Sequence, residues 1–325
     1  MDRWNNSSGV LLVLVAGILW GTVGPAQALA EPSASPVAVG GARILGGGLV
    51  LAAVVLATRP RTFLTLARGP LARGTWPPLA AATTATGTFQ ASFFSAVDRT
   101  GAAVATAVVF GLAPVSTGLC ERIVLGSALG RRWWAGTACA VGGVALLMVP
   151  GPQVHADPVG IGLSLVAGTC FGVYTVSAKV LTRQDVGMTA AVSVTLLAGG
   201  TALLPWMLAE TPRLAAPRTA ALVAWLGIAA TAAAYTAFVA GLRRVSAATA
   251  GTLSLAEPLV ATGIAVAVLG ERMSVPVGAG SLLLLAGLVI VSFPARTPRP
   301  AGRDRYDGAN ATGAVKVETT TGKRH

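Results

Sequence analysis

Long apolar stretches without a charged residue dominate this chain. Residues 10–30 and 187–209 contain no Asp, Glu, Lys or Arg, and each is close to the roughly 20 residues that cross about 30 Å of hydrocarbon. The 3.6-residue alternation of apolar and polar positions that marks a soluble surface helix is missing. The pattern predicts an all-α integral membrane protein with ten transmembrane helices, over residues 8–29, 37–57, 77–97, 101–125, 133–150, 159–179, 188–208, 219–241, 247–269 and 275–293.

The sequence also repeats itself. LVLVAGILWG at Leu12–Gly21 is echoed by LSLVAGTCFG at Leu163–Gly172, and Pro114 and Gly143 are followed 144 residues later by Pro258 and Gly287. Each copy opens a set of five predicted spans, and because five is odd, the second set must cross the bilayer in the opposite sense. We therefore expect two inverted five-helix repeats, at residues 1–150 and 151–294, followed by a tail at residues 295–325.

Arginine and lysine are distributed unevenly between the predicted loops. Most of the 24 lie in the loops and tail on the side of the N-terminus, whereas the opposite loops hold Arg99, Arg213, Arg218 and Arg272. Cytoplasmic loops retain positive charge, so both termini are expected in the cytoplasm and the protein in the inner (plasma) membrane. The net charge of +12 then reflects topology, and no nucleic-acid partner is expected.

The segment at residues 295–325 is polar and rich in Pro, Gly, Thr and Arg, and it has few large apolar residues. This composition predicts a disordered cytoplasmic tail. It is either an inert solvated end or a segment weakly attracted to anionic lipid.

Little in the sequence suggests an enzyme. The chain has two histidines, and Cys120, Cys139 and Cys170 fall on three different predicted spans without ligand spacing. There is no Gly-rich phosphate loop and no nucleophile elbow. Neither a metal nor a cofactor is expected, and 54% hydrophobic against 11% charged residues excludes an ordinary soluble protein.

Ionisable groups deep in the predicted spans are the strongest functional candidates. Glu257 lies near the middle of its span, where a carboxylate is costly unless it is protonated, paired or facing water, so proton coupling is possible there. Arg43 could bind a solute carboxylate or pair with Glu257, or it could reach toward the interface. Glu121 is a second candidate, with an interfacial position as the alternative. Pro114 and Pro258 are expected to break their helices.

Amphipathic and aromatic residues could line a shared cavity. Gln90 and Tyr235 correspond across the repeat when Ala102-Ala103 is aligned with Ala247-Ala248. Aromatic residues near helix ends more often form an interfacial belt, which is the alternative for each of them. The full set of these candidates is Trp20, Gln90, Phe94, Tyr174 and Tyr235.

The chain resembles the EamA-type family of the drug/metabolite transporter superfamily across residues 8–293. The residues that carry the resemblance are Trp20-Gly21, Arg43, Ala234-Tyr235, Leu242-Arg243, Glu257-Pro258 and Leu269-Gly270-Glu271-Arg272. The resemblance implies a ten-helix carrier in the inner membrane, commonly an exporter of amino acids, other metabolites or drugs. The first half departs from the family pattern, with Ala113-Pro114 where the second half has Glu257-Pro258, and with Ser127 after Leu125-Gly126.

These observations predict a secondary transporter that moves a small metabolite, amino acid or drug by alternating access, with export favoured over uptake. The alternative is a non-transporting membrane assembly or a lipid-handling protein of the scramblase type. The expected partners are a small-molecule solute and the lipid bilayer, while the oligomeric state is left open.

Overall fold

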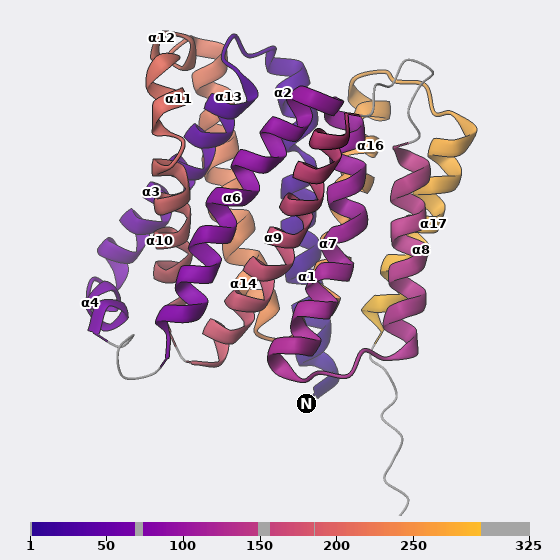
Figure 1. Ribbon diagram of the computed structural model, residues 1–325, viewed down its shortest axis with the longest axis horizontal. Helices are drawn as coiled ribbons and strands as arrows, with labels where there is room; N and C mark the ends of the chain where they lie inside the picture. The colour runs from indigo at the N-terminus through magenta and orange to yellow at the C-terminus, as the bar shows by residue number, and fades with distance from the viewer. Residues whose placement is uncertain (1, 69–73, 149–156, 185, 294–325) are drawn as a thin grey trace, which may run out of the picture. The chain divides into compact units, whose positions relative to one another are not determined.

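The computed structural model describes residues 2–68, 74–148, 157–184 and 186–293, which all belong to one compact unit. Every regular element in these ranges is a helix (Figure 1). The predicted tail at residues 295–325 lies outside the described residues. The helices are α1 (Asp2–Gly21), α2 (Val23–Ala30), α3 (Pro36–Thr58), α4 (Arg61–Arg68), α6 (Trp76–Thr100), α7 (Ala102–Leu125), α8 (Arg131–Leu147), α9 (Pro158–Arg183), α10 (Met188–Thr201), α11 (Leu204–Ala209), α12 (Thr211–Leu214), α13 (Pro217–Gly227), the π-helix η1 (Ile228–Ala233), α14 (Ala234–Leu242), α15 (Ala247–Leu253), α16 (Ala256–Val268) and α17 (Val275–Ser292).

Local sequence explains many of the helix boundaries. The Ser35 side chain caps α3 and is followed by proline at the first helical position, and Asp157 caps α9 in the same way. Ser246 caps α15 by accepting a hydrogen bond from the N–H of Thr249. Gly126 ends α7 with a φ of 64°, a left-handed conformation that glycine adopts without strain.

Seven helical segments are long and apolar enough to cross a membrane. Three other predicted spans do not meet both conditions, and each has a physical reason. Helix α6 has 25 residues but carries many polar side chains, α8 has 17 residues and begins with two arginines, and α10 has 14 residues before the chain is interrupted. The described part of the chain is thus an all-helical membrane protein with at least these seven candidate spans.

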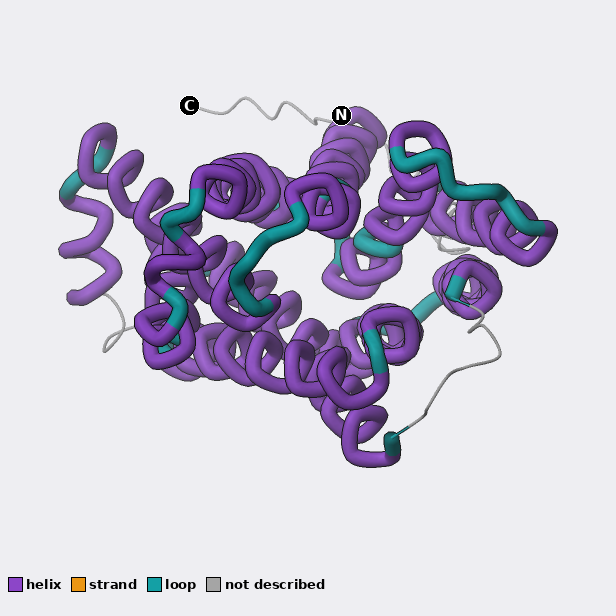
Figure 2. The backbone as a smooth tube through the Cα atoms, turned by 90° about the horizontal axis from the view of Figure 1, so that it is seen from above, coloured by secondary structure: helices purple, strands orange, loops and turns teal. Residues whose placement is uncertain are grey.

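The helices run roughly along one common direction, since most appear end-on when the view is turned by 90° (Figure 2). One end of the bundle carries the start of α1, helix α4 and the turn between α14 and α15, and we call it the N-terminal end (Figure 1). The opposite end carries the segment between α2 and α3 together with α12.

The two expected proline breaks have different outcomes. Helix α7 continues without interruption through Pro114, so no break occurs there. The Ser116 and Thr117 hydroxyls donate hydrogen bonds to the carbonyl of Ala113, the residue just before this proline. In the second half, the helix is interrupted between Leu253 and Ala256, just before Pro258.

The repeated glycines make closely similar contacts in the two halves. A Cβ atom added at Gly17 of α1 would lie 2.9 Å from the Ala256 Cβ, and one added at Gly168 of α9 would lie 3.0 Å from the Leu112 Cβ. Residues 112 and 256 are 144 positions apart, the same separation as the repeated prolines. Glycine at these positions lets the helix backbones approach closely.

The next glycine of each repeat continues the pattern. Gly21 packs against Val260 of α16, and Gly172 packs against Ser116 of α7. The two contacted residues, Ser116 and Val260, are again 144 positions apart. Helix α1 therefore contacts α16 in the same way that α9 contacts α7.

Candidate functional site

A cavity of about 420 Å³ lies between helices from both halves of the chain. Its wall includes the end of α6 and the starts of α3 and α7, all of which lie at the opposite end of the bundle, and it reaches inward to Tyr235 and Glu257 near the middle of the helices. This volume is suited to a small molecule.

Eight of the ten sequence-predicted residues line this cavity, and two do not. Glu121 and Pro114 are both in α7 and are not part of the cavity wall. The eight that the fold brings together are Trp20, Arg43, Gln90, Phe94, Tyr174, Tyr235, Glu257 and Pro258.

The two charged residues of the cavity come from different helices. Arg43 is in α3 and Glu257 is in the first turn of α16, where the helix dipole favours a negative charge. Their opposite charges attract one another, yet within the described part of the chain neither forms an ion pair shorter than 4.0 Å. Both side chains therefore lie in the cavity wall without an ion-pair partner in that part of the chain.

Aromatic rings form the inner part of the wall. The Tyr235 ring lies 5.5 Å from Trp20 and 5.7 Å from Tyr174 between centroids, and both pairs meet edge to face. Such contacts contribute about 0.5–1.5 kcal/mol beyond burial and hold the rings in place. The rings present a fixed apolar surface beside the two charges.

Two polar atoms of the wall are buried without a partner among the described residues. These are the Nε atom of Arg43 and the hydroxyl oxygen of Tyr174. A buried polar group without a hydrogen bond costs on the order of 1–3 kcal/mol, so such groups in a cavity wall are candidates to bind a solute.

Helix α6 contributes residues that the sequence reasoning missed. Thr86, Phe89, Phe93 and Val97 line the cavity along with Gln90 and Phe94. Their spacing of three to four residues places them on one helix face, and a search for such a face in this less apolar segment could have found them. The Phe94 ring fits because position 40 of α3 is glycine, where a Cβ atom would overlap it.

Glu121 has a structural role in this fold. It is 1% exposed, and its carboxylate oxygens accept hydrogen bonds from the backbone N–H groups of Ala247 (3.1 Å) and Ala248 (2.6 Å), in the first turn of α15. The expectation that Glu121 faces a solute pathway therefore does not agree with its position. No cluster of three or more His, Cys, Asp or Glu side chains suited to a metal ion occurs among the described residues.

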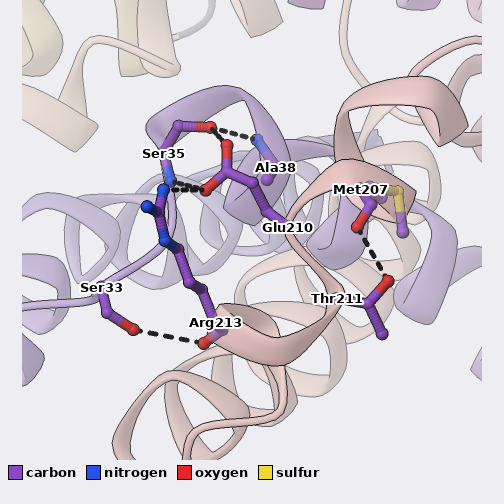
Figure 3. Close-up of polar contacts among 7 residues, drawn as sticks. All are labelled: Ser33, Ser35, Ala38, Met207, Glu210, Thr211 and Arg213. Atoms are coloured by element: carbon purple, nitrogen blue, oxygen red, sulfur yellow. Dashed lines mark hydrogen bonds and ion pairs between the residues drawn. The ribbon is translucent and has the colours of Figure 1, made fainter.

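A polar cluster at the opposite end fastens the start of α3 (Figure 3). The Glu210 carboxylate accepts hydrogen bonds from the Ser35 hydroxyl and from the Ser35 backbone N–H, and Arg213 lies 3.6 Å from it. The Ser35 hydrogen bonds, side chain first, hold the pKa of Glu210 below its ordinary value, and Arg213 adds to this effect. The cluster joins α3, which carries Arg43, to the segment between α11 and α12.

Comparison with known proteins agrees with this architecture. The model of the EamA-like transporter family matches residues 7–149 and residues 158–293. The uncharacterized transporter YwfM of Bacillus subtilis is 35% identical over 292 residues, which cover 90% of this chain and 96% of that protein. The uncharacterized inner membrane transporter YicL of Salmonella typhimurium is 26% identical, covering 89% of this chain and 96% of its own length.

A solved crystal structure has the same fold. It superposes with a TM-score of 0.72 at 21% sequence identity, covering 87% of this chain and 96% of its own chain. The relatives and the family are named for transport rather than for catalysis. With the family model matched across both halves, the chain is a multi-pass membrane protein that belongs to the EamA-like transporter family.

Proposed function

We propose that this protein is a secondary transporter that binds a small, partly apolar solute in the cavity and moves it by alternating access, in the direction of export. The observation that carries the proposal is the pairing of two unengaged charges, Arg43 and Glu257, with an aromatic wall in one cavity of about 420 Å³. Arg43 binds a carboxylate of the solute through its guanidinium fork, and Glu257 binds a cationic group or a proton. An amino acid or another zwitterion of similar size offers both groups.

The two-repeat architecture is part of this proposal. We take the ten segments expected from the sequence as ten spans in two inverted five-helix repeats, at residues 1–150 and 151–294. The neighbours of Gly17 on α16 match those of Gly168 on α7, and the same holds for Gly21 and Gly172, which supports an equivalent role for the two halves. Inverted repeats that meet at a central site can rock about that site, which is the motion that alternating access needs.

Glu257 is the proposed coupling residue. It is the only acidic side chain in the cavity wall among the described residues, and it lies beside the interruption between α15 and α16. A carboxylate at this depth can exchange a proton with the solute pathway, so a proton gradient can drive the solute. Trp20, Gln90, Phe94, Tyr174 and Tyr235 shape the pocket around the solute.

The test is solute flux in proteoliposomes with an imposed pH gradient. Pooled amino acids, sugars and cationic drugs are screened with the unmodified protein, with Glu257→Gln and with Glu271→Gln, which changes an exposed carboxylate outside the cavity. We expect saturable flux that falls about tenfold or more only in Glu257→Gln, because a charged contact has been lost.

Other outcomes separate the alternatives. Saturable flux that survives in Glu257→Gln with an unchanged pH profile contradicts the coupling role. Lipid scrambling without flux of any solute favours the lipid-handling alternative.

A further inference from the structure

Two buried charges lie outside the cavity, beside the turn that joins α14 to α15. Glu121 of α7 is 1% exposed and Lys179 of α9 is 8% exposed. Both are closer to the N-terminal end of the bundle than the cavity is, since α7 ends at Leu125 and α9 ends at Arg183 there. The proposed solute site uses neither of them.

Lys179 fastens one side of the turn. Its ammonium group donates hydrogen bonds to the carbonyl of Leu242 (2.6 Å) and to the carbonyl of Val245 (2.7 Å). Leu242 is the last residue of α14, where a positive charge complements the helix dipole and satisfies carbonyls that have no partner within the helix.

Glu121 fastens the other side of the turn. Its two carboxylate oxygens accept one hydrogen bond each from Ala247 and Ala248, the first two residues of α15. A negative charge is favourable at this end of a helix. The opposite charges of Glu121 and Lys179 also attract one another across the turn.

Neighbouring contacts close the same region. The indole N–H of Trp133 donates to the Ala248 carbonyl at 3.0 Å, and the hydroxyls of Thr137 and Thr252 lie 2.8 Å apart. Gly251 of α15 packs directly on Thr117 of α7. Helix α15 is therefore tightly packed against α7 and α8, outside the cavity.

Two buried charges are stable only while their hydrogen bonds are complete, because an unpaired charge in a low-dielectric interior is costly. Any movement of α15 away from α7 removes the partners of Glu121. The two sets of hydrogen bonds thus stabilise the arrangement in which the α14–α15 turn is packed on α7 and α9, relative to arrangements in which it has moved away.

We propose that Glu121 and Lys179 act together as a lock that holds the N-terminal end of the transporter closed while the cavity is accessible from the opposite end. The inference rests on the proposed alternating-access function. In the other half of the cycle the turn separates from α7 and α9, and the lock opens. Glu121 and Lys179 are positioning residues, since neither touches the cavity.

Cys170 offers a reporter, because it lies in the cavity wall whereas Cys120 and Cys139 do not. The experiment uses the full chain in a Cys120→Ser/Cys139→Ser background, reconstituted in sealed vesicles. A membrane-impermeant maleimide is added to one side of the membrane at a time, and the labelling rate of Cys170 is measured. The variants are Glu121→Gln, Lys179→Met and the neutral pair Glu121→Gln/Lys179→Met, with Glu271→Gln as the exposed control.

We expect Glu121→Gln to change the ratio of labelling rates between the two sides by about fivefold or more, in favour of the N-terminal side. The double variant should differ from the sum of the single variants, because the two residues act on one turn. If a single variant does not fold, the neutral pair removes both buried charges at once and keeps the test decisive.

An unchanged ratio in folded Glu121→Gln or in the folded double variant overturns the lock. The measurement does not depend on solute flux. A shifted ratio therefore supports the lock even where no screened solute is transported, and that missing flux counts against the proposed function alone.

Discussion

Arg43 and Tyr174 carry the buried polar atoms that have no partner among the described residues of the cavity wall. Burying such atoms lowers the stability of the fold, because burial removes their water and supplies no hydrogen bond in return. Their cost is explained if a solute completes the hydrogen bonds. This makes a stability measurement informative about function.

Tyr174→Phe should leave the protein as stable as before, or slightly more so, because it deletes a hydroxyl without a partner. Its solute affinity should fall by about three- to tenfold, since a hydrogen bond to the solute contributes about 0.5–1.5 kcal/mol. Thermal unfolding in detergent and the KM of solute flux check the two parts separately. A clear loss of stability with an unchanged KM would show that the hydroxyl serves the fold instead.

Glu210 should make stability depend on pH. Its pKa is lowered in the folded state by the Ser35 hydrogen bonds, so its contribution is present above the ordinary pKa of a glutamate and is lost as the pH falls through the lowered value. Glu210→Gln should therefore reduce the difference in unfolding temperature between neutral pH and about pH 3. Glu271→Gln is the exposed control. An equal pH dependence in the protein and in Glu210→Gln would contradict this assignment.

The contacts of α1 with α16 and of α9 with α7 depend on glycine. A Cβ atom at Gly21 would lie 2.8 Å from the Glu257 carbonyl oxygen, and one at Gly172 would lie 2.8 Å from the Thr117 backbone nitrogen. These neighbours are backbone atoms, which cannot rotate away as a side chain can. The two helix pairs would have to separate to accept even a methyl group.

Gly21→Ala and Gly172→Ala should each destabilise the protein by about 1–3 kcal/mol, as overpacking does in a close-packed interior. Gly46→Ala is the matched control, because nothing lies within 4 Å of its added Cβ atom, and alanine favours helix there. Thermal unfolding of the three variants in one detergent checks whether Gly21→Ala and Gly172→Ala are less stable than Gly46→Ala. Similar stability in all three would show that α1 and α9 can move without cost.

At the level of the whole chain, the distribution of Lys and Arg predicts the orientation in the bilayer. The N-terminal end of the bundle includes Arg59, Arg61, Arg131 and Arg132, at the end of α3 and the starts of α4 and α8. Positive residues in short loops are retained in the cytoplasm. The cavity would then face the side away from the cytoplasm.

Reporter fusions should place both ends of the chain in the cytoplasm. A fluorescent protein that matures only inside the cell should be bright at either terminus, and an alkaline phosphatase fused at the C-terminus should be inactive. A phosphatase placed after Arg213, in the predicted outer loop, should be active and is the control. An active phosphatase at the C-terminus would contradict the even number of spans or the orientation.

Much of the helical architecture could be predicted from the sequence, because hydropathy, capping residues and glycine or proline positions act locally. The same holds for the candidates Glu257 and Arg43, whose charges are unusual in apolar segments. The sequence ranked Glu257 above Glu121, but it could not show that Glu121 lies away from the cavity. Their difference depends on which backbone groups other helices bring to them.

The sequence by itself determined that the chain is helical and membrane-spanning and which few residues are costly there, because these properties follow from neighbouring residues and from the bilayer as solvent. Only the tertiary structure decided that Glu121 meets the N–H groups of α15, that Lys179 meets the carbonyls at the end of α14, and that Phe89 and Phe93 join the cavity wall. It also decided that α15 packs against α7 and α8, outside the cavity. These features arise where segments far apart in the chain come within a few ångströms, and no local pattern encodes that distance.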